Sequence, residues 1–284
     1  MPQTIHVLLT ILAPIIWGTS YLITSEWLPE DYPITIAMLR ALPAGLLILI
    51  ILRQWPQKNQ WWKVFILGGL NFTVFWICLF VSAYRLPGGI AATLGALQPL
   101  IVIGLSYGLL NNKVHLLSLA SAVMGIVGVA LLVLKSTIHL DLIGIVAAVS
   151  GAVSMALGTV LSKQWRGHSS LMAFTGWQLS AGGLLLLPLS LFFEPSFPVL
   201  DIKSIGGLLW LSLFGAVLSY LLWFNGIAKL NSVQVSTLAF LSPVTAILLG
   251  WLILEQNLST LQLAGVFIIF ISIITTTMTE EKNA

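Results

Sequence analysis

Charged residues are scarce in this sequence. Asp, Glu, Lys and Arg make up 7% of its 284 residues, whereas 58% are apolar. A typical soluble domain contains roughly 25% charged residues, and a soluble globule with far fewer would expose apolar side chains to water. The composition therefore excludes a soluble enzyme, a nucleic-acid-binding protein and a disordered chain. It predicts an integral membrane protein.

Cysteine and the usual catalytic motifs are also scarce. The single cysteine, Cys78, lies inside an apolar run, so no intramolecular disulfide can form and a disulfide scaffold is excluded. The sequence contains no nucleotide-binding P-loop, so ATP does not drive the protein directly. Its apolar runs hold no paired aspartates, no Ser with His and no metal-ligand spacing of His and Glu. We therefore expect no catalysis, no cofactor and no metal site.

Long apolar runs are abundant instead. Stretches of about 20 residues, the length that crosses a bilayer, alternate with short polar or turn segments. The ten predicted spans are 5–25, 34–52, 62–83, 89–110, 115–134, 142–162, 171–193, 205–226, 233–254 and 261–278. This pattern predicts an all-α, multi-pass protein of the inner or plasma membrane.

Basic residues indicate the orientation of the spans. If both termini face the cytoplasm, the cytoplasmic connections contain eight Lys or Arg residues and the opposite connections contain three. Positive residues concentrate in cytoplasmic loops. We therefore expect both termini to lie inside the cell.

An internal repeat divides the chain into halves. Sliding the sequence by 144 residues aligns the fourth span with the ninth, and slightly different offsets align other spans. The matched pairs include Leu86 with Leu230, Thr93 with Thr237, Leu94 with Leu238, Pro99 with Pro243, Trp76 with Tyr220, Gly18 with Gly158, and Arg40 with Gln178. Apolar helices can resemble one another by composition alone, but proline and threonine matches at one offset favour a true repeat.

The two predicted halves, residues 1–137 and 138–284, each contain five spans. An odd number of spans means that the second half crosses the membrane in the opposite sense to the first. Inverted repeats of this kind are typical of secondary transporters. Exchange of the conformations of the two halves would convert an outward opening into an inward one.

Several motifs resemble those of a known family. They are Trp17-Gly18-Thr19-Ser20, Arg40 with Ala44, Leu241-Ser242-Pro243-Val244, and Leu254-Glu255-Gln256-Asn257-Leu258-Ser259 followed by Gln262 and Gly265. Over essentially the whole chain, as two tandem copies, the sequence resembles the EamA-type domains of the drug/metabolite transporter superfamily. The stretch 84–93 is most similar to members described as pigment or metabolite exporters.

The resemblance implies a ten-helix inner-membrane carrier. Its central cavity would lie between two four-helix groups, with the fifth and tenth helices at the periphery. One departure concerns Glu255, whose counterpart in the first half is Asn111. We therefore do not expect this carboxylate to act in both halves.

Arg40 is the only charged residue well within a predicted span. It lies about 10 Å from the outer end of the second span, at 1.5 Å per residue. A charge in hydrocarbon is costly and calls for a partner. Arg40 could attract a carboxylate or other anionic group of a substrate, or it could bond helix-end carbonyls or extend to the interface. Both hypotheses remain open at this point.

Prolines interrupt the fourth and ninth spans at matching positions. Pro99 follows Gln98, and Pro243 follows Ser242. Each proline removes a helical hydrogen bond and frees a carbonyl that a ligand can use. We predict paired hinges at Pro99 and Pro243, with Gln98 and Ser242 in the binding site. Kinks that contact no substrate are the alternative.

Amides and aromatic rings complete the candidate site. Asn71 and Gln178 can each donate and accept hydrogen bonds, either to substrate or to another helix. Tryptophan also occurs inside the spans, and rings there would suit planar, partly apolar or cationic substrates. We predict that Trp17, Trp76, Trp177 and Tyr220 line the cavity. Packing or lipid contact is the alternative for each tryptophan.

The fifth span carries small residues, including Ser121 and Gly125, at the spacing of closely packed helices. The spacing predicts either packing within the chain or a homodimer contact through the peripheral helices. The sequence alone does not separate the two.

Together these features predict a secondary transporter that exports small metabolites, amino acids or drug-like molecules by alternating access. The alternatives are a facilitative uniporter or exchanger, an uptake carrier for the same substrates and, more remotely, an intramembrane enzyme. A channel would be expected to show charged rings or filter loops. Because no Asp, Glu or His lies deep in any predicted span, we expect weak or indirect proton coupling.

Overall fold

The computed structural model describes residues 3–29, 32–86, 88–111, 115–133, 141–194, 197–255 and 257–282, and these residues form helices joined by short turns and loops. The helices are α1 (Gln3–Trp27), α2 (Pro33–Leu52), α3 (Trp61–Gly68), η1 (Gly69–Val74), α4 (Phe75–Arg85), α5 (Gly88–Gly95), α6 (Gln98–Leu110), α7 (Leu116–Val133), α8 (Leu142–Trp165), α9 (Leu171–Phe193), α10 (Ile202–Ser212), η2 (Leu213–Leu218), α11 (Ser219–Lys229), α12 (Ser232–Leu238), α13 (Leu241–Ile253) and α14 (Thr260–Lys282).

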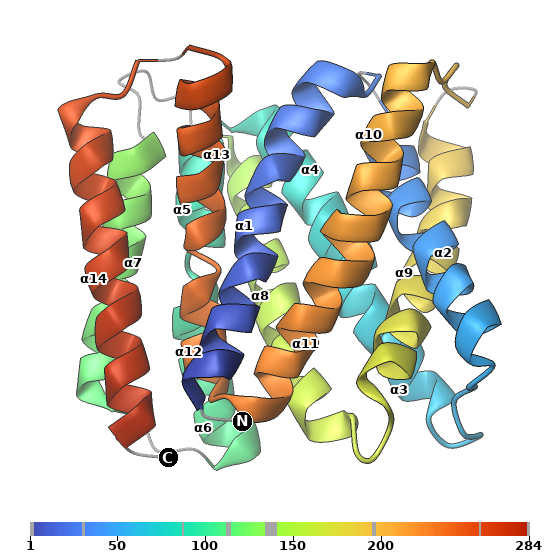
Figure 1. The fold of residues 1–284 in the computed structure, drawn as a ribbon, viewed down its shortest axis with the longest axis horizontal. Helices are drawn as coiled ribbons and strands as arrows, with labels where there is room; N and C mark the ends of the chain where they lie inside the picture. Colours follow the sequence, from blue (N-terminus) through green and yellow to red (C-terminus); the bar gives the residue numbers. More distant parts are fainter. Residues whose placement is uncertain are drawn as a thin grey trace.

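These helices make ten crossings, which confirms the number predicted from the apolar runs. Nine helical segments of the described residues are long and apolar enough to span a membrane, and α7 adds a shorter apolar helix. Helix α1 begins and α14 ends at the same end of the bundle (Figure 1), here termed the terminal end. Whether that end faces the cytoplasm stays a prediction. The predicted boundary between 137 and 138, and Lys113 and Lys135 of the charge comparison, lie outside the described residues.

The third and eighth crossings each contain a short π-helix. The segments η1 and η2 each have six residues, and they begin at Gly69 and Leu213, at the 144-residue offset of the repeat. Hydrogen bonds in a π-helix run from i to i+5, so the helix widens locally and its carbonyls become available to other donors. The two halves therefore share a backbone irregularity that their sequences do not reveal.

The fourth and ninth crossings are both interrupted just before a proline. Helix α5 ends at Gly95 and α6 begins at Gln98, whereas α12 ends at Leu238 and α13 begins at Leu241. Pro99 and Pro243 have no N–H, so neither can continue the regular hydrogen-bond ladder. Tight i→i+3 bonds cross both breaks, from Leu97 N to Leu94 O at 3.1 Å and from Phe240 N to Thr237 O at 3.2 Å.

Helices α2 and α9, the second helix of each half, pack closely against each other at glycines. A Cβ on Gly45 of α2 would overlap the backbone of Ser180, and a Cβ on Gly183 of α9 would overlap Leu42. These are equivalent contacts, because an offset of 138 residues relates Leu42 to Ser180 and Gly45 to Gly183. The pair is thus built with approximate two-fold symmetry, as expected of an inverted repeat.

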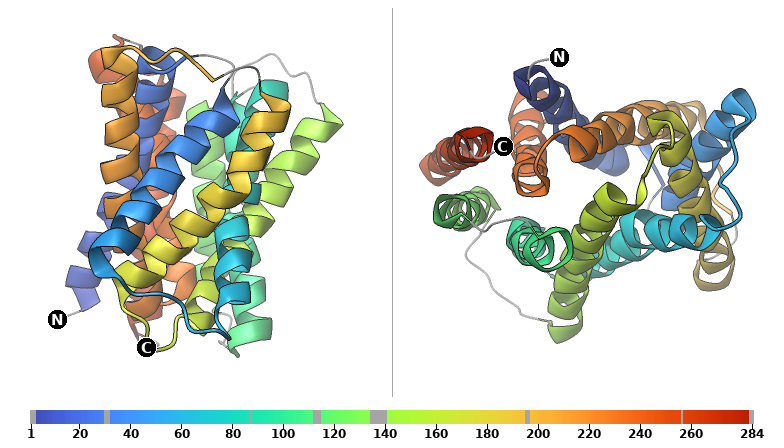
Figure 2. Two further views of the ribbon diagram at one scale, coloured as in Figure 1. Left: turned by 90° about the vertical axis from the view of Figure 1, so that its right-hand side faces the viewer. Right: turned by 90° about the horizontal axis from the view of Figure 1, so that it is seen from below.

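Helices α7 and α14 lie side by side at one edge of the molecule (Figure 2, right). The small residues of α7 face into the chain: Gly125 lies against Phe240 and Ser272, and Gly128 lies against Ile269. Ser272 Oγ also donates to Ser121 O at 2.5 Å. Contacts within the chain therefore use this stripe, in agreement with the packing alternative. The homodimer hypothesis for the peripheral helices remains a prediction.

Carboxylates cap several helices at the end opposite the termini. Glu194 accepts hydrogen bonds from Ile34 N and Thr35 N at the start of α2, where the helix dipole favours a negative charge. Asp141 accepts from Gly144 N at 2.8 Å and lies 3.3 Å from Arg85 Nη1. The hydrogen bond from Gly144 lowers the pKa of the Asp141 carboxyl below its ordinary value, and Arg85 adds to this effect.

The pair Asn111 and Glu255 has a structural explanation. Both residues adopt a left-handed backbone conformation, with φ of 54° and 52° respectively, just after equivalent helices. Asn tolerates this conformation better than most residues, whereas Glu is unusual there. The position therefore requires a turn in both halves, and a carboxylate is not needed to make that turn.

The two halves are not packed equally tightly. All seven residues of α12 are buried. In the equivalent helix α5, Thr93 and Leu94 are partly exposed and Gly95 is exposed. Helix α12 lies toward the terminal end and α5 toward the opposite end (Figure 1). Among the side chains that the structure describes, those of α12 are therefore more deeply buried than those of α5.

Candidate functional site

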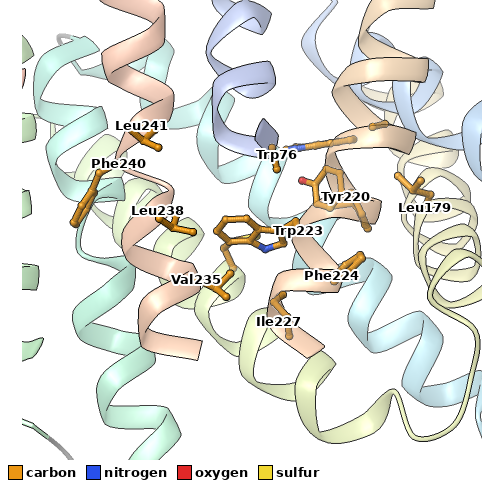
Figure 3. Close-up of a cluster of buried hydrophobic side chains, with 14 of the residues drawn as sticks. Trp76, Leu179, Tyr220, Trp223, Phe224, Ile227, Val235, Leu238, Phe240 and Leu241 are labelled. Carbon is orange, nitrogen blue, oxygen red and sulfur yellow. The ribbon is translucent and has the colours of Figure 1, made fainter. Parts of the chain in front are cut away.

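Aromatic side chains from the first, third and eighth crossings pack against one another. Figure 3 shows three of them, Trp76, Tyr220 and Trp223, in the interior of the bundle. The ring centroid of Tyr220 lies 5.1 Å from Trp17 and 4.6 Å from Phe72. Trp17 also lies 4.9 Å from Trp223, and Phe72 lies 5.4 Å from Trp76. Trp17 is partly exposed, whereas the other four are buried. We refer to these five residues as the aromatic cluster. It brings together Trp17, Trp76 and Tyr220, whose predicted role in lining a cavity stays a prediction.

The guanidinium of Arg40 lies directly beside this cluster. Its Cζ atom is 5.1 Å from the centroid of the Trp76 ring, within the range of a cation–π interaction. Nη2 donates to Gly215 O at 2.6 Å, while Nε is buried and has no partner among the described residues. The salt bridge found in the described residues joins Arg85 and Asp141, so no carboxylate there neutralises Arg40.

The π-helix η2 makes the Arg40 contact possible. The Gly215 carbonyl within η2 accepts both from Arg40 and from Ser219 Oγ, the latter at 2.7 Å. Ser219 Oγ in turn accepts from Trp17 Nε1 at 2.8 Å. One displaced carbonyl therefore links α2 and the aromatic cluster through a continuous hydrogen-bond chain.

The equivalent place in the first half holds two amides. Asn71 in η1 donates from Nδ2 to Gln178 Oε1 at 2.8 Å and to Ser162 Oγ at 3.2 Å. Asn71 matches Gly215 and Gln178 matches Arg40 in the repeat, so the amide pair is the counterpart of the Arg40–Gly215 pair. Both amides are at most 1% exposed. Their observed contacts are with helices, as the interhelical alternative predicted.

Gly158 should be essential to this amide pair. A Cβ at this position would overlap Asn71 Oδ1. We expect Gly158→Ala to displace Asn71 and to lower the free energy of unfolding by about 1–3 kcal/mol, the cost of leaving a buried amide unpaired. Thermal unfolding of the detergent-solubilised protein tests this expectation. Gly108→Ala is the control, because a Cβ at Gly108 would meet nothing within 4 Å. Equal unfolding temperatures for the two variants would contradict the prediction.

The remaining predicted residues lie away from the aromatic cluster or are not tied to it by hydrogen bonds. Trp177 packs in a separate group with Leu49 and Leu67, and its Nε1 donates to Gln54 O at 2.8 Å. Gln98 is buried at the start of α6, and its Nε2 has no partner among the described residues. Ser242 is partly exposed. Its backbone carbonyl packs closely against Gly18 of α1, where an added Cβ would lie only 2.7 Å from the Ser242 oxygen.

Some members of the site were not predicted from the sequence. Phe72 and Trp223 complete the aromatic cluster, and Gly215 with Ser219 supplies its hydrogen-bond chain. The 144-residue offset could have indicated Gly215, because it places that residue on the polar Asn71. The sequence carries no signal for the π-helix that turns its carbonyl toward Arg40.

The sequence also matches known proteins. The model of a family described as the EamA-like transporter family matches residues 4–134 and again residues 142–278. Protein PecM of Dickeya dadantii (strain 3937) is 44% identical over 264 residues, covering 92% of this chain and 89% of that protein. The uncharacterized transporter YvbV of Bacillus subtilis (strain 168) is 27% identical over 280 residues, covering 96% and 92%.

Two further comparisons extend these matches. A protein of Salmonella typhimurium named "Probable amino-acid metabolite efflux pump" is 23% identical over 275 residues, covering 92% of this chain and 91% of that protein. A solved crystal structure superposes with a TM-score of 0.85 at 18% identity and 99% coverage of both chains, which shows a shared fold. With its ten apolar crossings and its doubled family match, this chain belongs to the EamA-like transporter family and is a multi-pass membrane transporter.

Proposed function

We propose that the protein is a secondary transporter that exports small metabolites, amino acids or drug-like molecules by alternating access. The inverted halves support this proposal, because they allow two equivalent conformations of opposite sidedness. The unequal packing of α12 and α5 supports it further. Helix α12 is fully buried, while the described side chains of the matching helix α5 are partly exposed, as expected if the two ends of the bundle are closed to different extents.

The position of Arg40 carries the proposal for the substrate. Arg40 lies within a membrane span, where its guanidinium is above the Trp76 ring and bonded to a carbonyl, and its buried Nε has no partner among the described residues. A cation in that environment is stabilised by an anionic ligand. The adjacent rings of Trp17 and Tyr220 offer flat apolar surfaces for stacking. We infer that planar molecules with a carboxylate or another anionic group are the preferred substrates.

The name of one relative agrees with this inference. The Salmonella typhimurium protein is named an amino-acid metabolite efflux pump, and amino acids carry the carboxylate that Arg40 would bind. Coupling to protons is proposed to be weak or indirect, because no Asp, Glu or His lies deep in any predicted span and Arg40 stays protonated.

A thermal-shift screen of the purified protein tests the substrate class. The probes are planar aromatic carboxylates, their neutral carboxamides, and ring-saturated carboxylates of the same size. We expect the planar carboxylates to stabilise the protein most, by about 2.7 kcal/mol at a concentration 100 times the Kd. Counterflow in proteoliposomes would then show that a stabilising ligand is transported.

Two outcomes of this screen would contradict the proposal. Equal stabilisation by carboxylates and carboxamides would show that Arg40 does not recognise the negative charge of the ligand. Equal stabilisation by planar and saturated ring systems would remove the role of stacking on the aromatic cluster.

A further inference from the structure

The turn between α11 and α12 is held from two sides at the terminal end. On one side, Lys163 Nζ of α8 donates to Leu230 O. On the other side, Asn231 Nδ2 donates to Glu280 Oε2 of α14 at 2.7 Å. Asn231 also caps α12, since its Oδ1 accepts from Val233 N at 2.9 Å. The position of α12 is therefore fixed by contacts with two other helices.

Glu280 is well placed to hold this turn. It is only 3% exposed, although the sequence places it beyond the last predicted span. Its second carboxylate oxygen accepts from Ser118 Oγ of α7 at 2.5 Å. A buried carboxylate is costly unless hydrogen bonds satisfy it, and bonds to a charged group are among the strongest. One carboxylate thus joins α7, α12 and α14.

The first half cannot make the same contacts. At the 144-residue offset, Leu86 and Pro87 take the places of Leu230 and Asn231, and proline has no side-chain donor. The offset that matches Gly18 with Gly158 places Ile23 opposite Lys163. Ile23 is a buried apolar residue. The hydrogen bonds that Lys163 and Asn231 make at this turn are therefore specific to the second half.

We propose that Asn231 and Glu280 form a latch that keeps α12 packed and makes the terminal end the closed end at rest. The proposal rests on the alternating access proposed above. In an inverted repeat, the conformation open at one end and the conformation open at the other end are held by equivalent contacts of the two halves. A contact that only one half makes therefore shifts the equilibrium between these two conformations. The latch lies on α12, the buried helix, and not on its partly exposed counterpart α5. Asn231 and Glu280 are thus positioning residues for the transport cycle.

Cysteine labelling at both ends of the bundle tests the latch. In a Cys78→Ser background, one reporter is Val235→Cys on α12, where Val235 is fully buried. The other reporter is Leu94→Cys on α5, where Leu94 is partly exposed. In detergent both ends are accessible to a polar maleimide, so the labelling rates need no assumption about orientation.

Exchanging the donor and the acceptor separates the latch from a general loss of structure. Asn231→Asp keeps the cap of α12 but places a second carboxylate against Glu280, and Glu280→Gln leaves one acceptor oxygen for two donors. The double variant restores one hydrogen bond with its polarity reversed. A change of about 100-fold in the equilibrium constant between the two conformations would convert a 99:1 ratio, with the terminal end closed in the major form, to roughly equal populations.

We expect Asn231→Asp to speed labelling at position 235 by tens of times and to slow labelling at position 94 by about half, as this shift predicts. Glu280→Gln should act in the same direction with a smaller change, and the double variant should return both rates to within about twofold of the parent. Two single variants that leave both rates unchanged would overturn the latch and leave the proposed function intact. Faster labelling at position 235 with no change at 94 would show local opening only, and would overturn the latch together with coupled alternating access.

Discussion

Replacing Arg40 with methionine should lower the affinity for a planar anionic ligand by roughly 10- to 100-fold, because a charge-assisted hydrogen bond contributes about 1.5–3 kcal/mol. Methionine retains the length and apolar contact of the arginine stem but has no charge. The Gly215 carbonyl keeps a donor in this variant, since Ser219 Oγ still bonds it. The loss should therefore come from the ligand and not from the helix.

Titration of the variant with matched charged and neutral ligands checks this prediction. The affinity for a neutral planar analogue should change little, whereas the affinity for its carboxylate should fall. Arg53→Met is the control, because Arg53 is exposed at the end of α2. Arg40→Lys should lie between wild type and Arg40→Met, since lysine restores the charge without the planar fork. Equal losses for charged and neutral ligands would show that Arg40 is structural.

Replacing Gly45 with valine should destabilise the fold by about 3 kcal/mol or more. A Cβ at Gly45 would overlap the backbone of Leu179 and Ser180, and backbone cannot rotate out of the way. Helices α2 and α9 would be forced apart where the two halves meet. Thermal unfolding in detergent should show an earlier transition or the loss of folded protein.

Gly104→Val in α6 provides the matched control. A Cβ at Gly104 would meet nothing within 4 Å, so the same substitution should be tolerated. If the two variants unfold at the same temperature, close packing at Gly45 does not determine stability. Normal folding of Gly45→Val would place the interface of the halves elsewhere.

Span length and turn composition were sufficient to predict the ten crossings. Apolar runs of about 20 residues define membrane spans because unpaired backbone is costly in hydrocarbon. The breaks before Pro99 and Pro243 were also predictable, since proline lacks the N–H that a helix needs. The fixed offset between these prolines indicated the repeat that the helices confirm.

Side-chain partners were much less predictable. Asn71 and Gln178 lie more than one hundred positions apart, and only the packing of η1 against α9 brings them together. Trp177 is adjacent to Gln178 in sequence but points toward Gln54 near the end of α2, because successive helical residues face different sides. Glu280 follows the last apolar run, and hydropathy alone does not show that two other helices cover it.

The paired π-helices also show how one backbone geometry can serve two different chemistries. The same irregularity begins at Gly69 and at Leu213. At the matching position within it, the first half bonds α9 through the side chain of Asn71, whereas the second half bonds α2 through the carbonyl of Gly215. A side-chain substitution at position 71 can therefore remove the contact in the first half, but a substitution at position 215 leaves the acceptor of the second half in place, because the backbone supplies it.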